Sequence, residues 1–169
     1  MIRPIVKYGD PTLHRRAEAV HNVTAEIAAL ARDMVETMYA APGIGLAAPQ
    51  VGVPIRLVVI DLSLGRSPSG LITLINPEFV EREGTQLEEE GCLSVPGFNA
   101  TVARPDRAAI KGLDLDGHER VYTGEGLLAR AFQHELDHLD GRVFVDRLRG
   151  IKREMIVRRI RKQIRSGKW

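Results

Sequence analysis

Apolar side chains recur at helical spacing in two long stretches of the chain. From Val23 to Met38 they fall three or four residues apart, which predicts an amphipathic helix that begins near Thr24 and ends near Pro42. A second run, residues 127–139, is largely apolar and free of proline, and it also predicts a helix. These two segments supply the predicted helical part of the core.

Between residues 56 and 121 the pattern changes to short β-like segments. Glycine, proline, asparagine and aspartate separate them, and no helical segment intervenes, so an antiparallel or mixed sheet is favoured. A further short strand is expected after the second helix. The expected strands cover residues 57–60, 71–75, 79–82, 100–102, 108–113, 120–122 and 143–145.

Apolar residues also recur along the end of the chain, among many arginines and lysines. Asp146 is expected to cap a final helix that carries Ile151, Ile156 and Ile160 on its apolar face. The predicted fold class is therefore α+β. Antiparallel or mixed β-sheets would pack around the helix of residues 127–139, with an N-terminal helix and a basic C-terminal helix beside them.

Length and composition fit one compact domain that spans residues 1–169. Hydrophobic residues make up 44% of the chain and charged residues 27%, which are ordinary globular values. The start shows no secretory signal pattern, and no apolar run approaches the roughly 20 residues that span a bilayer. We therefore expect a cytoplasmic protein without membrane association. The single cysteine, Cys92, excludes an internal disulfide.

Residues 133–138, Gln-His-Glu-Leu-Asp-His, are the strongest candidate for chemistry. At about 3.6 residues per turn, His134 and His138 share one helix face and can bind one divalent ion. Glu135 is rotated about 100° from His134, where its carboxylate can reach a water on that ion, as in the H-E-x-x-H metallohydrolases. A surface helix with charges at this spacing is the alternative interpretation.

Cys92 can supply a third ligand, because a thiolate and two imidazoles leave one tetrahedral position open for water. A metzincin would instead carry a third histidine at the position of Phe144. Glu154 is an unattractive ligand, because it falls in a basic segment that reads as exposed. Another alternative makes Cys92 a nucleophile with a histidine as its base, but it leaves the paired histidines unexplained.

Residues 43–50, Gly-Ile-Gly-Leu-Ala-Ala-Pro-Gln, match the dinucleotide-binding fingerprint when taken alone, with Asp61 after the next strand-like run. That fingerprint requires a strand before it and a helix after it. Here a helix precedes, and Pro49 interrupts any long helix that follows. The glycines can instead form a tight turn or let the backbone approach a ligand, and Gln50 offers an uncharged amide donor.

Residues 43–50, residues 90–94 (Glu-Gly-Cys-Leu-Ser) and residues 133–138 together resemble the three motifs of peptide deformylase, in this order and in a chain of this length. The resemblance implies a metal-dependent hydrolase that removes the formyl group from the N-terminal formylmethionine of newly made polypeptides. It implies that Glu135 is the general base and acid, and that Gln50 and the backbone N–H of Leu93 hold the oxyanion. The implied metal ligands are Cys92, His134 and His138.

The chemistry of formamide hydrolysis agrees with these roles. A bound divalent metal lowers the pKa of water from about 15.7 to about 7–9 and polarises the carbonyl. Hydroxide can then attack the formyl carbon, while Glu135 takes the proton and later passes it to the leaving amine. The family is commonly regarded as using Fe²⁺ in the cell, and Zn²⁺, Ni²⁺ and Co²⁺ are the other candidates.

An apolar wall is expected to select the first side chain of the peptide. Leu127 and Ala131 follow the histidine face of the helix and, with Ile44, are expected to line a slot for a methionine side chain. Arg130 stands where the family more often has an apolar residue. Either its stem lines the slot or its guanidinium turns to solvent.

The peptide backbone is expected to add as a strand beside the glycine-rich run. The resemblance places these contacts at residues 43–45, which include Gly45, and around Gly97. Arg104 is a further candidate, for a peptide carbonyl or a distal carboxylate, and an exposed surface role is its alternative.

The basic C-terminal helix indicates a partner beyond the peptide. One interpretation is a docked helix with a solvated basic face, and the other is an electrostatic contact with ribosomal RNA, with no role for DNA. Two rival functions share part of these features. A metallopeptidase would use the same metal core on unformylated peptides, and an RNA-binding module would keep its function without metal.

Overall fold

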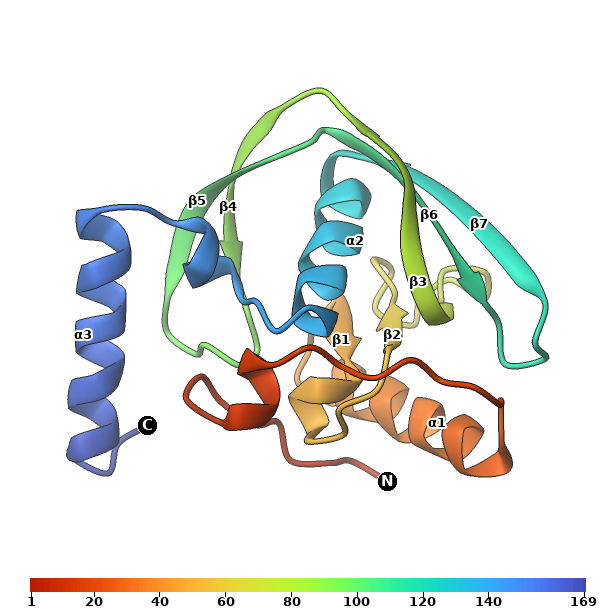
Figure 1. The fold of residues 1–169 in the computed structure, drawn as a ribbon, viewed down its shortest axis with the longest axis horizontal. Helices are drawn as coiled ribbons and strands as arrows, with labels where there is room; N and C mark the ends of the chain where they lie inside the picture. The colour runs from red at the N-terminus through yellow and green to blue at the C-terminus, as the bar shows by residue number, and fades with distance from the viewer.

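The computed structural model describes residues 1–169 and contains three α-helices, seven β-strands and three short 3₁₀ helices. The helices are α1 (Ala25–Ala40), α2 (Gly126–Leu139), α3 (Ile151–Arg165), η1 (Pro11–His14), η2 (Ala48–Val51) and η3 (Phe144–Arg147). The strands are β1 (Gly45–Ala47), β2 (Leu57–Ile60), β3 (Ile72–Glu83), β4 (Gln86–Gly91), β5 (Asn99–Arg104), β6 (Arg107–Leu113) and β7 (Glu119–Glu125). Figure 1 shows α2 in the middle of the molecule, with β4 and β5 on one side and the remaining strands on the other.

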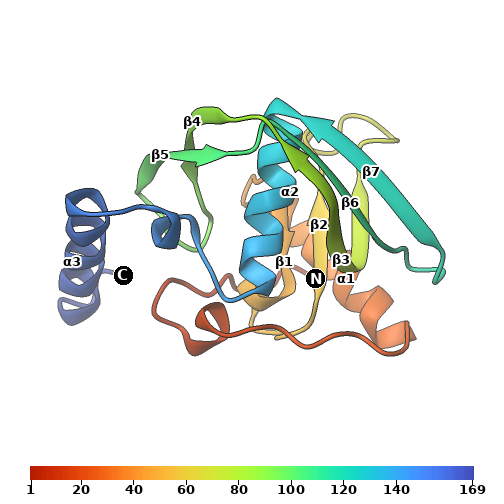
Figure 2. The same cartoon turned by 45° about the horizontal axis from the view of Figure 1, so that its top comes forward.

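Five strands form one sheet in the order β1-β2-β3-β6-β7, and β4 pairs with β5 in a separate ribbon. Every pair of neighbouring strands is antiparallel. The α+β prediction is therefore confirmed, in its antiparallel form. β1 forms one edge of the larger sheet and contacts α2, as Figure 2 shows from above. This contact brings the glycine-rich run to the helix that carries the paired histidines.

Strand β3 is longer than the sequence predicts, because the two segments expected on either side of Asn76-Pro77 form one strand. The register between β3 and β6 shifts between Ile75 and Glu78, which accommodates a proline that cannot donate to the ladder. The Asn76 carboxamide makes two hydrogen bonds of 2.8 Å with the backbone of Val20. The proline therefore interrupts the ladder without ending the strand.

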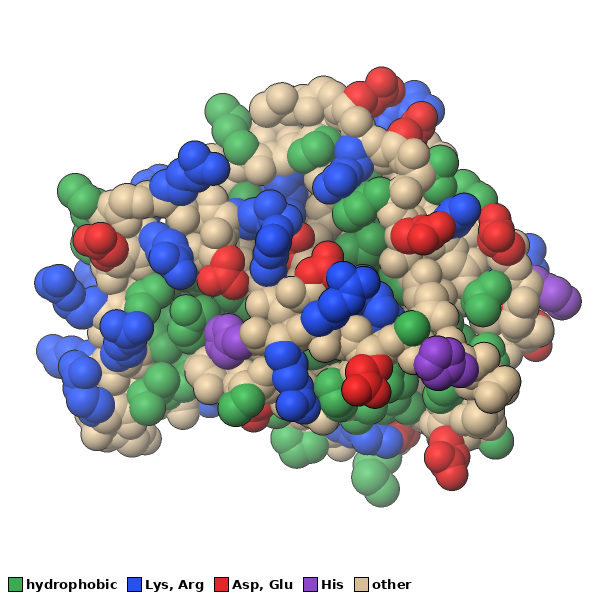
Figure 3. Space-filling view, in the orientation of Figure 1, with side chains coloured by type: hydrophobic (Ala, Val, Ile, Leu, Met, Phe, Trp, Pro, Cys, Tyr) green, Lys and Arg blue, Asp and Glu red, His purple; other side chains and the backbone are tan.

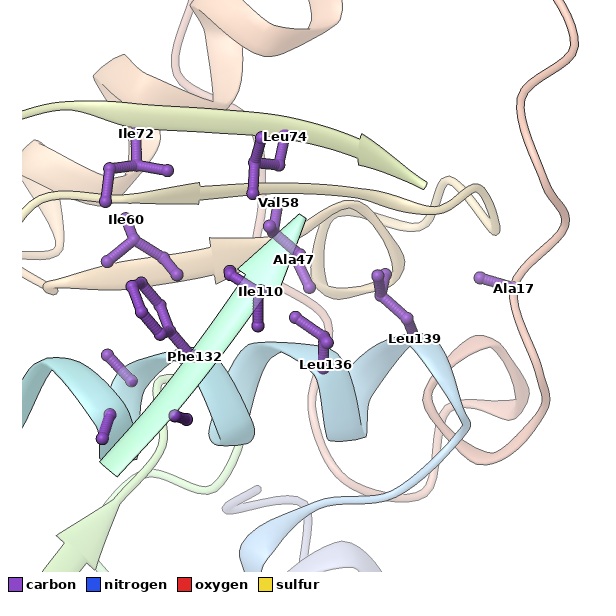
Figure 4. Packing of buried hydrophobic residues seen from close by; sticks show 13 residues of the cluster. Ala17, Ala47, Val58, Ile60, Ile72, Leu74, Ile110, Phe132, Leu136 and Leu139 are labelled. Carbon is purple, nitrogen blue, oxygen red and sulfur yellow. The ribbon is translucent and has the colours of Figure 1, made fainter. Parts of the chain in front are cut away.

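The main hydrophobic core lies between α2 and the larger sheet. Figure 4 shows Phe132, Leu136 and Leu139 pointing from α2 toward the strands. The facing side chains of this core include Ala47, Val58, Ile60, Leu74 and Ile110. Because the three α2 residues are spaced at three and four positions, they occupy one side of the helix. His134 and His138 leave α2 from another side.

Helix α1 covers the opposite face of β1 and β2. It begins after Thr24, whose hydroxyl accepts a hydrogen bond from Ile27 N at 3.3 Å, and it ends before Pro42, in agreement with the prediction. Its buried apolar residues pack against Leu57 and Val59, whereas the alternate β2 residues face α2. All four residues of β2 are buried for this reason.

The segment after α2 differs from the prediction. The strand expected at residues 143–145 is wrong, because the chain forms η3 there, and Asp146 accepts a hydrogen bond from Val143 N at 2.9 Å. Asp146 therefore does not cap α3, whose N-cap residue is Gly150. Helix α3 buries only Ile160. None of the helices has the length and apolar character that crossing a membrane requires.

Candidate metal centre

Three ligand-type side chains converge between β4 and α2. Cys92 follows β4, and its Sγ lies 3.3 Å from His138 Nε2, which in turn lies 3.2 Å from His134 Nε2. The ligand atoms of all three residues lie within 4.8 Å of one another. The turn of helix between the two histidines sets their separation, and the β4–β5 ribbon brings the sulfur to them. One ion can contact all three atoms.

The donor set fits a divalent transition metal. A thiolate with two imidazole nitrogens is a set that zinc and iron accept, and it leaves a coordination position open. His138 is fully buried, and its Nδ1 has no hydrogen-bond partner. Burial lowers the pKa of His138, and the neighbouring His134 lowers it further. A neutral imidazole is the form that binds a metal.

Glu90 lies behind His134 and contacts it directly. His134 Nδ1 lies 2.6 Å from Glu90 Oε2, so this ring nitrogen donates to the carboxylate and leaves Nε2 free to bind a metal. Burial raises the pKa of Glu90, but hydrogen bonds from Arg104 and His134 outweigh burial and hold this pKa below its usual range. The acidic run of residues 88–90 thus contributes a buried ionised carboxylate.

Arg104 and Arg130 are buried beside Glu90. Their burial tests the predictions made for both arginines. A surface role for Arg104 is wrong: it is 4% exposed, binds both oxygens of Glu90 and donates to Asp137 Oδ2 at 3.0 Å. The guanidinium of Arg130 does not turn to solvent either. It is 3% exposed and donates to Glu90 Oε1 at 2.7 Å. The charges of Glu90 and Asp137 explain why both arginines are buried.

Glu135 lies on the β1 side of α2. A Cβ added to Gly45 would fall 2.5 Å from Glu135 Oε1, so glycine is required where strand and carboxylate meet. Glu135 is 3% exposed, and its Oε2 has no hydrogen-bond partner. Burial raises the pKa of Glu135 to about 7. A carboxyl group with that pKa can exchange a proton near neutral pH.

Gln50 is buried beside Cys92 and is held in one orientation. Its Oε1 accepts a hydrogen bond from Ala47 N at 2.9 Å, and its Nε2 faces Ser94 Oγ at 3.2 Å and Cys92 Sγ at 3.6 Å. The amide N–H groups therefore point toward the sulfur. Sequence reasoning missed Ser94, although it belongs to the same motif as Cys92. The glycine-rich run forms β1 and η2, which is not the strand-turn-helix of a dinucleotide site.

A cavity of about 390 Å³ opens beside these groups. Five of the predicted substrate residues line it: Ile44, Gly45, Leu127, Arg130 and Ala131. Gly97 is exposed on a loop and Arg104 is buried in its ion pairs, so neither lines the cavity. Sequence reasoning missed Pro42, Glu89 and Gly91, which line the cavity and adjoin the predicted motifs.

The chain is similar to known proteins over its whole length. The profile of the polypeptide deformylase family matches residues 2–154. A peptide deformylase of Acidobacterium capsulatum is 53% identical over 169 residues, which are 100% of this chain and 99% of that protein. A peptide deformylase of Halothermothrix orenii is 51% identical over 152 residues, covering 90% of this chain and 97% of the relative.

Solved structures show the same fold. The crystal structure of a Legionella pneumophila peptide deformylase has a TM-score of 0.91 and 44% identity, and covers 99% of this chain and 98% of that one. The structure of an Ehrlichia chaffeensis peptide deformylase in complex with actinonin has a TM-score of 0.87 and 38% identity, and covers 96% of this chain and 97% of that one.

Proposed function

The chain belongs to the polypeptide deformylase family, and from this membership we propose that Cys92, His134 and His138 hold the divalent metal of its active centre. The protein is a hydrolase that removes the formyl group from the N-terminal formylmethionine of nascent polypeptides. We further propose that residues 1–169 act as one catalytic domain in the cytoplasm. The convergence of the three ligand atoms within 4.8 Å of one another is the observation that carries the proposal.

The buried site supports a metal of this class. Glu90 contacts Nδ1 of His134, and His138 Nε2 lies close both to the sulfur of Cys92 and to His134 Nε2. The Nε2 atoms of both rings are therefore placed to bind one ion together with the sulfur. We propose Fe²⁺ as the metal in the cell, with Zn²⁺, Ni²⁺ or Co²⁺ able to replace it. When bound, such an ion lowers the pKa of water and polarises the formyl carbonyl.

Proton transfer is assigned to Glu135. Its carboxyl group is buried next to the metal ligands, and burial raises its pKa to about 7. It would take a proton from the attacking water and deliver it to the leaving amine, so that formate and a free N-terminus result. The buried Oε2 of Glu135 has no hydrogen-bond partner and is available for this exchange.

The developing oxyanion is assigned to Gln50 and the backbone N–H of Leu93. Both residues line the cavity, and the Gln50 amide is fixed before substrate arrives because Ala47 and Ser94 hold its two ends. Donors fixed in advance stabilise charge that appears only in the transition state. The cavity wall formed by Ile44, Leu127 and Ala131 would then receive the methionine side chain.

An assay of formate release tests this function. We expect anaerobically purified protein to contain one divalent metal and to release formate from a formyl-methionyl peptide. Glu135→Gln should keep the metal and lose about 100- to 10,000-fold in turnover, the usual range for a general acid–base. Glu154→Gln on the exposed face of α3 is the control and should behave as the native protein.

Two results would contradict the proposal. Full turnover by Glu135→Gln would remove Glu135 from the reaction. Cleavage of unformylated peptides in preference to formylated ones would identify a metallopeptidase. An RNA-binding module would be indicated if the metal-free protein kept its function.

The basic face of α3 supports a further partner, the ribosome. Figure 3 shows Lys and Arg side chains gathered over the edge of the molecule where α3 lies. A cavity of about 420 Å³ occurs there, between Tyr8 and the α3 side chains Arg153, Arg158, Arg161 and Arg165. Clustered guanidinium groups suit the phosphates of RNA, and such binding weakens as salt rises.

The contact with ribosomes is best tested by substitutions in α3. Removing the chain from residue 147 onward would also remove Arg147, which pairs with the buried Asp137. Glutamine at Arg158, Arg161 and Arg165 should weaken ribosome binding and flatten its dependence on salt, while small formylated peptides are still hydrolysed. Lysine at the same three positions keeps the charge and is the matched control. Equal binding by the native protein and the glutamine variant would dispose of this role.

A further inference from the structure

The carboxylate of Glu90 has a complete set of hydrogen-bond donors. Arg104 donates to Oε1 at 2.8 Å and to Oε2 at 2.7 Å, Arg130 donates to Oε1 at 2.7 Å, and His134 Nδ1 lies 2.6 Å from Oε2. A carboxylate offers about four acceptor positions, and all of them are taken. Glu90 therefore has no freedom to rotate away from His134.

Two of these donors come from the same helix. Arg130 and His134 are four residues apart on α2, so they leave the helix on one face, one turn apart. Arg130 reaches Oε1 of Glu90, and His134 reaches Oε2. Side chains of α2 therefore contact both oxygens of the Glu90 carboxylate. These two contacts fix the position of the carboxylate relative to the His134 ring.

We propose that Arg130 is a positioning residue for the metal centre, which acts by fixing the Glu90 carboxylate that orients the ring of His134. This inference rests on the proposed metal function of His134. Arg130 also lines the cavity. The role proposed for its guanidinium group is separate from that one.

Arg130 is itself held by partners on both strands of the ribbon. Its Nε donates to Gln86 Oε1 on β4 at 3.0 Å, and its Nη2 donates to the carbonyl of Val102 on β5 at 2.8 Å. The Gln86 amide in turn donates to the carbonyl of Gly126, at the start of α2, at 2.9 Å. A planar guanidinium with three fixed acceptors has one orientation. The position of the β4–β5 ribbon therefore fixes Arg130, and through Glu90 it fixes the ring of His134.

The roles of Arg130 and Arg104 differ. Arg104 binds both oxygens of Glu90 and also Asp137, so its loss would break two buried ion pairs. Loss of Arg130 leaves Glu90 paired with Arg104 and in contact with His134. We therefore expect Arg130→Met to fold, which makes its effect on metal binding measurable.

Metal affinity gives the direct test. Zn²⁺ affinity is measured by competition with a chromogenic chelator for the native protein, Arg130→Met and Arg130→Lys. Partners that orient a metal ligand typically contribute about 10- to 100-fold to metal affinity, and we expect a loss in that range for Arg130→Met. Arg130→Lys keeps a donor for Glu90 and should recover most of the affinity. The visible absorption of the Co²⁺ form should change in Arg130→Met, because the ligand geometry changes.

Arg56→Met is the matched control. Arg56 also fastens α2, through the carbonyl of Leu139 and the carboxylate of Asp140, but it has no contact with Glu90. Its replacement should leave the affinity and the Co²⁺ spectrum unchanged. Equal losses in Arg56→Met and Arg130→Met, or native metal binding by Arg130→Met, would overturn the inference.

His134→Ala separates this inference from the function on which it rests. This variant should lose Zn²⁺ almost completely in the same competition. If it binds Zn²⁺ as the native protein does, the metal centre itself is misassigned and the inference falls with it. If His134→Ala loses the metal while Arg130→Met does not, only the role of Arg130 is overturned.

Discussion

Helices α2 and α3 are almost equal in length but differ in how deeply their side chains are buried. Of the 14 residues of α2, eleven are buried, whereas only Ile160 is buried among the 15 residues of α3. The buried residues of α2 include six polar or charged side chains: Arg130, Gln133, His134, Glu135, Asp137 and His138. The charged side chains of α3 are all exposed.

This difference separates two uses of charge. A charge inside the protein requires partners, because a buried unpaired charge is strongly unfavourable. Around α2 the buried carboxylates of Glu90 and Asp137 are therefore held by arginines. Glu135 has no such partner, and burial raises its pKa to about 7. The charges of α3 are solvated and act independently of one another. Single substitutions should have large effects near α2 and small ones on the surface of α3.

The largest effect on stability is expected for Arg104→Met. Removing this arginine leaves Glu90 and Asp137 with fewer partners in the interior, and breaking a buried ion pair from one side costs about 3–5 kcal/mol. Chemical denaturation of the metal-free protein measures the free energy of unfolding. Arg147→Met is a control, since Arg147 also binds Asp137 but its side chain is 37% exposed. If Arg147→Met lowers the free energy of unfolding by as much as Arg104→Met, burial does not explain the contribution of the Arg104 ion pairs to stability.

The next largest effect is expected on turnover, for Gln50→Ala. If the Gln50 amide stabilises the oxyanion, its removal should lower kcat about 100- to 1,000-fold, or about 3–4 kcal/mol, with little change in metal content. Ser94→Ala frees one end of that amide and should lower kcat by a smaller factor. Unchanged kcat in Gln50→Ala would exclude Gln50 as an oxyanion donor.

A smaller loss of stability is expected for Ile160→Ala, which truncates the one buried residue of α3. Ile160 is fully buried in a cluster with Phe144, Val145 and Leu148. Truncation of a buried isoleucine to alanine costs about 2–5 kcal/mol, and we expect the lower half of that range because α3 lies at the edge of the molecule. Thermal unfolding measures it, and a shift no larger than that for Ile151→Ala, which is exposed, would show that α3 is not anchored through Ile160.

The smallest effect is expected when surface charges of α3 are removed. Glutamine at Lys152, Arg159 and Lys162, all exposed, should change the free energy of unfolding by less than about 0.5 kcal/mol per site. Formate release from a small peptide should stay at the native level. A large loss of activity would show that the surface charges of α3 affect the active centre, which would contradict the contrast drawn between α2 and α3.

Much of the fold could be predicted from local patterns. The periodicity of α1 and α2 predicts both helices to within a few residues, because their apolar faces repeat at helical spacing and prolines or glycines end them. The spacing of His134 and His138 fixes their common face for the same reason. Strands formed by short apolar segments could also be predicted, and β2 and β6 are examples.

Other features depend on contacts between distant residues. The acidic sequence of β4 resembles a solvated loop, yet it forms a strand because β5 pairs with it, and Glu90 becomes buried because two arginines reach it. Cys92 and His138 are 46 positions apart, so only the packing of the ribbon against α2 decides that they meet. The sequence by itself determined which helix carries the histidines and which residue types are available to them. The tertiary structure alone decided that Arg104 and Arg130 lie inside, since burial of a charge depends on where its partners are in space.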